Sequence, residues 1–135
     1  MSDYGISVLL DADMATARTR VEVALADQGF GVLTEIDVAA TLKKKIRKKV
    51  PAQIILGACD PHLADRALEA EPSIGMLLPC NVVLRDSGDG RTVVSAINPV
   101  ALVTFTGNPA LESIAAEARL RLIAALDELT AKVAP

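Results

Sequence analysis

The stretch Leu56-Gly-Ala-Cys59-Asp60-Pro61-His62-Leu63-Ala64 passes from a strand to a helix within a few residues. Residues 53–56 form a short, mostly apolar run, as in a buried strand. Asp60 can cap the first turn of the helix, and Pro61 suits the first helical position, where no backbone N–H is needed. The stretch therefore predicts a strand-to-helix junction that places the thiol of Cys59 next to a helix start.

Alternating apolar residues, glycines and prolines define the elements on either side of this junction. The predicted strands are residues 4–10, 31–36, 53–56, 81–85 and 92–97. The predicted helices are residues 14–28, 39–49, a helix from Pro61 that Pro72 ends, and 110–132. Asn108-Pro109 repeats the order of cap and proline seen at Asp60-Pro61. Residues 100–106 fit either a helical turn or an edge strand, and residues 73–79 form an apolar connection.

The order of these elements predicts one α+β domain over residues 1–135. Strands 81–85 and 92–97 flank a turn with two glycines, which is typical of an antiparallel hairpin. We expect one sheet, with the first and last helices packed on one of its faces. Apolar residues make up 51% of the chain and Trp is absent, so the core must consist mainly of Ala, Val, Leu and Ile.

Composition limits which cellular compartment and which classes of partner we expect for this protein. The net charge of −3 argues against general attraction to nucleic acid. We see no signal peptide, and the apolar runs are far shorter than the roughly 20 residues of a membrane helix. The expectation is a cytoplasmic, soluble protein without a membrane segment. In a reducing compartment its two cysteines are expected to be free thiols.

Cys59, Asp60, His62 and Cys80 form the first candidate site. Cys59 and His62 lie three residues apart at a helix start, where a thiol is biased toward the thiolate. If Cys80 folds nearby, the two thiols and the imidazole could bind Zn²⁺ or Cu(I), or the thiols could form a redox pair. Asp60 opposes this activation because its negative charge raises the pKa of a neighbouring thiol. Alternatively, both cysteines are small buried apolar residues and His62 lies on the surface.

A hydrolase with Cys59 as nucleophile and His62 as base is a weaker interpretation, because no third group that would orient the base is identifiable.

The run from Lys43 to Lys49 is the second candidate site. It holds six positive charges in seven residues, while the rest of the chain has 8 basic and 17 acidic residues, a balance of −9. Such a helix can bind phosphate, an anionic membrane surface or an acidic protein, or it can simply face water. We expect Leu42 and Ile46 to anchor the helix, with the charges pointing to solvent. The basic residues are Lys43, Lys44, Lys45, Arg47, Lys48 and Lys49.

The junction and the stretch Gly75-Met-Leu-Leu-Pro79-Cys80-Asn-Val together resemble the hallmark block of the domain of unknown function 302 family. Residues 29–38 and 98–101 resemble its flanking segments, so the likeness extends from about residue 4 to 129. The resemblance implies a curved antiparallel sheet with helices on one side, similar to the arrangement in TATA-binding protein, and a homodimer. It marks Cys59 and Cys80 as motif positions and implies no activity, substrate or cofactor.

The expected function is a small homodimeric module that binds a ligand or a metal at Cys59, His62 and Cys80. The alternatives are a cysteine-dependent redox enzyme and an interaction protein that docks an acidic partner through residues 43–49. Residues 73–78 also favour a dimer, because their apolar side chains have no obvious partner within the chain.

Overall fold

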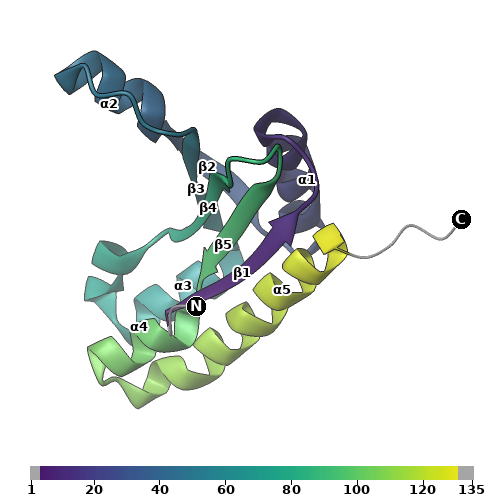
Figure 1. Cartoon of the computed structure of the whole chain (residues 1–135). Coiled ribbons are helices and arrows are strands. Elements are labelled where there is room, and N and C mark those ends of the chain that lie inside the picture. The colour runs from purple at the N-terminus through teal and green to yellow at the C-terminus, as the bar shows by residue number, and fades with distance from the viewer. Residues whose placement is uncertain (1–3, 131–135) are drawn as a thin grey trace, which may run out of the picture.

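The computed structural model of the chain describes residues 4–130, which form five strands and five α-helices (Figure 1). The strands are β1 (Gly5–Leu10), β2 (Gly31–Asp37), β3 (Gln53–Cys59), β4 (Cys80–Asp86) and β5 (Thr92–Ile97). The helices are α1 (Met14–Asp27), α2 (Val38–Ile46), α3 (Pro61–Ala70), α4 (Pro99–Thr106) and α5 (Glu112–Thr130). Short 3₁₀ helices, η1 (Pro72–Leu77) and η2 (Pro109–Leu111), precede β4 and α5.

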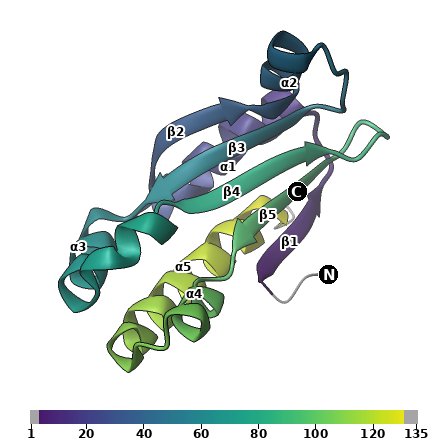
Figure 2. The same ribbon diagram turned by 90° about the vertical axis from the view of Figure 1, so that its left-hand side faces the viewer.

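All five strands form one open antiparallel sheet in the order β1-β5-β4-β3-β2. Helices α1 and α5 pack against each other on one face of this sheet, so the predicted α+β class and the predicted packing of the first and last helices are confirmed (Figures 1 and 2). Chain direction places α2 at one end of the strands, and α3, η1 and α4 at the other end.

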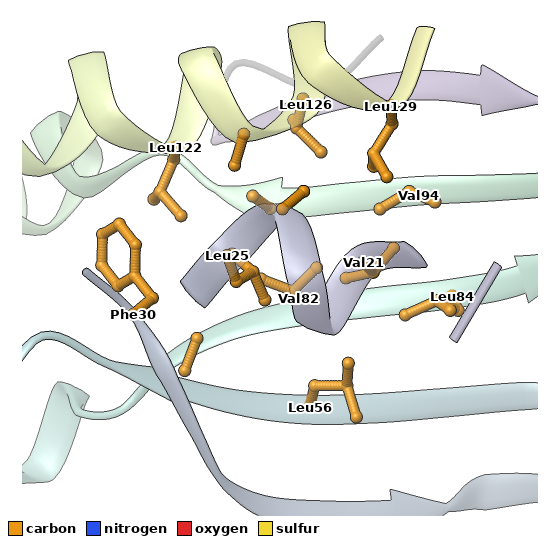
Figure 3. Close-up of a cluster of buried hydrophobic side chains, with 14 of the residues drawn as sticks. Val21, Leu25, Phe30, Leu56, Val82, Leu84, Val94, Leu122, Leu126 and Leu129 are labelled. Carbon is orange, nitrogen blue, oxygen red and sulfur yellow. The ribbon is translucent and has the colours of Figure 1, made fainter. Parts of the chain in front are cut away.

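The main core lies between the sheet and these two helices. Figure 3 shows Leu122, Leu126 and Leu129 of α5 pointing toward the strands, with Leu56 and Val82 among the strand residues of the cluster. As predicted, the core is almost entirely aliphatic, and Phe30 is its one aromatic member among the buried residues of the described chain. Aliphatic side chains fill such an interior closely but leave few stacking contacts.

The sheet face turned away from α1 and α5, here called the open face, carries no helix over its centre (Figure 2). Side chains alternate between the two faces of a strand, so the open face takes the residues between the buried core positions. They are Ser7, Leu9, Thr34, Ile36, Gln53, Ile55, Gly57, Asn81, Val83, Arg85, Val93, Ser95 and Ile97. Six of these thirteen residues are polar, Arg85 being the one that carries a charge, and six are apolar, so the open face is mixed in character.

The segment 38–50, here called the basic arm, departs most from the sequence prediction. Helix α2 ends at Ile46 rather than at Lys49, because Arg47 adopts the left-handed conformation with φ of 54°. Ile46 is 65% exposed, so it does not anchor the helix as expected, and Leu42 is only partly buried. The arm leaves the strand ends away from α1 (Figure 1), and its six basic side chains are all exposed.

Three further features extend, decide or correct the sequence predictions. Strand β3 continues through Gly57 to Cys59, because β2 and β4 pair with it along that length. Residues 100–106 belong to a helix, α4. Ile74 has an internal partner after all, since it is buried against Ala67 and Leu111. The predicted extension of the last helix to Lys132 lies outside the described residues.

Candidate ligand pocket

Asp60 holds the strand-to-helix junction together. It is 4% exposed, and its carboxylate accepts hydrogen bonds from the backbone N–H groups of His62 at 2.9 Å and Leu63 at 3.2 Å. The other carboxylate oxygen pairs with the guanidinium of Arg121 on α5. One carboxylate therefore caps α3, as the sequence predicted, and also ties α3 to α5.

Gly29 allows the chain after α1 to approach this ion pair closely. Its φ is +89°, a conformation that side-chain-bearing residues rarely adopt, and a Cβ atom there would lie 2.9 Å from Asp60 Oδ2. The end of α1, the start of α3 and the middle of α5 consequently meet at Asp60. This meeting point forms one wall of the pocket described below.

Cys59 and Cys80 lie on adjacent strands, β3 and β4. Cys80 stands opposite Ala58 in the register, so Cys59 lies one residue beyond the partner of Cys80, at the end of β3. Both thiols are free and partly buried, and both line the same cavity. The structure thus brings together the two cysteines that the sequence placed in one site.

Neither thiol is activated. Burial raises the pKa of the Cys59 thiol, and the adjacent Asp60 carboxylate adds to the effect. Burial, with a smaller contribution from Cys59, raises the pKa of Cys80 to about 11. The bias toward thiolate that a helix start favours is therefore outweighed at Cys59, and both groups are neutral thiols at pH 7.

We expect Cys80 to be alkylated by iodoacetamide more slowly than Cys59 at pH 8, with a rate that still rises up to about pH 11. The reason is that only the thiolate reacts, and its fraction falls about tenfold for each pH unit below the pKa. Mass spectrometry of alkylated peptides between pH 7 and 11 measures both rates. In urea both rates should level off near the ordinary pKa of about 8.5. A plateau for folded Cys80 below pH 9 would contradict the assignment.

His62 does not join the two cysteines. It is exposed on the first turn of α3 and is not part of the cavity lining. Among residues 4–130, no three His, Cys, Asp or Glu side chains are grouped so that they could hold a metal ion. The expected three-ligand site of Cys59, His62 and Cys80 is therefore not assembled, because His62 faces solvent while the two cysteines line the cavity.

The cavity beside the cysteines has a volume of about 360 Å³ and opens to solvent. It lies at the end of the sheet between α3, η1, α4 and α5. Of the described residues that line it, Asp60 alone is charged, and that carboxylate is already paired with Arg121. The remaining walls are apolar, and they include Leu63, Ile74, Leu102, Leu111 and Ile114.

The sequence predicted the wall of this cavity that contains the two cysteines, but it did not predict the other walls. The missed walls come from η1, α4 and the start of α5, which are distant from Cys59 in the sequence. The sequence signal for these walls is the apolar character of residues 74–78, which by themselves favour a dimer contact, and of residues 99–103, which overlap a segment of ambiguous structure. The basic arm lies at the opposite end of the strands and takes no part in the cavity.

No helix among residues 4–130 combines the length and apolar character that a membrane span requires.

Comparison with known proteins agrees with the resemblance noted in the sequence. Residues 6–129 match the family model for the domain of unknown function DUF302. A similar solved structure is the crystal structure of an uncharacterized conserved DUF302 protein from Bacillus stearothermophilus. It is 32% identical, superposes with a TM-score of 0.88, and the match covers 95% of this chain and 99% of the other. No curated protein matches the chain. The chain belongs to the DUF302 family.

Proposed function

We propose that this protein is a binding module for a small, uncharged, apolar molecule, which the cavity beside Cys59 and Cys80 holds. The observation that carries the proposal is the chemistry of the cavity: about 360 Å³, apolar walls, and one charged group that is already neutralised. Ligand sites are typically concave and mostly apolar, with volumes in this range. A charged ligand would lose its hydration there without gaining a partner.

The state of the cysteines supports binding over thiol chemistry. A redox enzyme needs an accessible thiolate at neutral pH, whereas the pKa of both thiols is raised. As neutral thiols they present polarizable, weakly polar sulfur to the ligand. The proposal includes a cytoplasmic location, because two free cysteines are stable in a reducing compartment.

Filling the cavity tests the proposal. Ala115 of α5 lines the cavity and its neighbour Ala116 is exposed, so Ala115→Met and Ala116→Met add the same side chain inside and outside the site. We expect prodan, an uncharged naphthalene fluorophore, to bind the wild type and Ala116→Met with a blue-shifted emission. Ala115→Met should weaken this binding at least about tenfold, because the added side chain occupies the same space.

Circular dichroism and a thermal melt establish that each variant is folded. Ala64→Met fills the cavity from the α3 side and replaces Ala115→Met if that variant is unstable. Equal prodan binding by the wild type and a folded filled variant would contradict the proposal, as would the absence of any binding by the wild type.

A further inference from the structure

The basic arm concentrates positive charge that no acidic side chain of the described structure neutralises. Its six cationic side chains are all exposed, and none of the ion pairs among residues 4–130 involves them. The rest of the chain, in contrast, has 8 basic and 17 acidic residues. Like charges held this close repel one another, and an anionic partner would relieve that repulsion.

The strand ends from which the arm projects also carry acidic side chains, but most of these are already engaged. Asp37 caps the first turn of α2, and Asp86 accepts a hydrogen bond from the backbone of the turn between β4 and β5. Asp89 is paired with Arg91. The connections at this end of the sheet, residues 11–13, 37–52 and 85–91, hold eight basic and five acidic side chains. A positive excess therefore remains, and the arm carries it away from the body.

An apolar stripe accompanies this charge along α2. Val38, Leu42 and Ile46 follow one another at four-residue intervals, so they share one face of the helix. The first two are half-buried, whereas Ile46 at the tip is 65% exposed. At about 100° per residue, Lys43 and Lys45 flank the stripe on its two sides. The arm projects beyond the strands (Figures 1 and 2), so its tip can reach a flat surface before the acidic body does.

We propose that the basic arm docks this protein on the surface of a lipid bilayer that contains anionic lipid. The side chain of Ile46 enters the interface, and the cationic side chains around it contact lipid phosphates. A basic helix with one apolar side is typical of segments that lie in the plane of a membrane surface without crossing it. Cytoplasmic membrane surfaces carry anionic lipids, which agrees with the cytoplasmic location proposed above.

The composition of the arm favours lipid over other anionic partners. Five of its six cations are lysines, and Lys is depleted in protein–protein interfaces. No aromatic side chain occurs in residues 38–52, so the bases of a nucleic acid would find none to stack on. An exposed Ile among lysines contributes little to a contact with a phosphodiester backbone, but it is stabilised when it leaves water at a bilayer surface.

Co-sedimentation with lipid vesicles tests the role of the charge. We expect the wild type to bind phosphatidylcholine vesicles that contain about 30% phosphatidylglycerol at about 50 mM KCl, to be released by high salt, and not to bind phosphatidylcholine alone. Lys44→Gln/Lys48→Gln should weaken binding roughly 30-fold, since each cation near an anionic surface contributes about fivefold. Arg66→Gln/Arg119→Gln is the matched control, because it removes the same charge from exposed positions of α3 and α5 and should bind like the wild type.

A single tryptophan tests the position of the tip. The chain has no Trp, so one introduced residue gives the whole tryptophan signal. The emission of Ile46→Trp should shift to the blue on anionic vesicles and be quenched by lipids brominated in the acyl chain, because Trp settles at membrane–water interfaces. Leu120→Trp is the matched control, since Leu120 on α5 is 66% exposed and Ile46 is 65% exposed. Its emission should not change.

Several results would overturn the proposal. They are no binding of the wild type to anionic vesicles, equal binding to neutral vesicles, and an unchanged affinity in Lys44→Gln/Lys48→Gln. Equal quenching at the two Trp positions would also contradict it. So would tighter binding of the wild type to polyglutamate or to a single-stranded oligonucleotide than to anionic vesicles, since the arm would then serve a protein or a nucleic acid. Circular dichroism establishes that each variant is folded, and Lys43→Gln/Lys49→Gln replaces the lysine variant if it is not.

Discussion

Asp60→Ala is expected to lower the free energy of unfolding by about 2–3 kcal/mol. Loss of the N-cap contributes about 1 kcal/mol. Loss of the charge-assisted bond to Arg121 adds about 1–2 kcal/mol, at the low end for such bonds because Arg121 remains partly exposed and can be hydrated. Urea unfolding followed by circular dichroism measures the change. Because α1, α3 and α5 meet at Asp60, this variant should also weaken prodan binding.

Asp60→Asn separates the two roles of this side chain. Asn caps helices about as well as Asp does, but it removes the charge that faces Arg121. We expect it to lose about 1–2 kcal/mol, the share of the bond to Arg121, which is about 1 kcal/mol less than the loss in Asp60→Ala. Equal losses in both variants would show that the ion pair, and not the cap, stabilises the junction. A loss below about 0.5 kcal/mol in Asp60→Ala would contradict both roles.

Gly57→Ala is expected to destabilise the protein by about 2–3 kcal/mol, because the added methyl group has no space. A Cβ atom at this position would lie 2.2 Å from Thr34 Oγ1 and 2.7 Å from Pro79 Cγ. The Thr34 side chain can rotate away, but the proline ring cannot, so β3 or the segment before β4 must shift. Thermal and urea unfolding report the loss.

Two variants make this prediction specific. Thr34→Ala/Gly57→Ala should recover part of the stability, because it removes the closer of the two contacts. Gly75→Ala should be nearly neutral, since its Cβ atom would meet only Leu68 at 3.9 Å. A neutral Gly57→Ala would mean that β3 and the turn at Pro79 are less closely packed than the structure shows.

Most of the fold could be predicted from patterns within short segments of the sequence. Caps at Asp13, Asp60, Asn98 and Asn108 each accept a hydrogen bond from a backbone N–H of the helix that follows. The hairpin of β4 and β5 and the aliphatic core also follow from patterns within short segments. These features depend on residues close together in the chain, where propensity and spacing are informative.

The remaining features depend on contacts between distant segments. The run of lysines looks like a helix through Lys49, yet the helix ends at Ile46, because Arg47 turns the chain back toward β3. The cavity needs α4 and α5 to fold against α3, which no local pattern specifies. His62 has the correct spacing from Cys59 for a shared site, but spacing alone did not reveal that its side chain faces solvent.

The central claim is that the cavity beside Cys59 and Cys80 binds an apolar molecule, and methyl NMR during a prodan titration tests it most directly. The account predicts saturable shift changes at cavity methyl groups such as those of Leu63, Leu111 and Ile114, and none at Leu9 or Ile55 on the open face. Shift changes confined to the open face, or no saturable change at the cavity methyl groups, would contradict it.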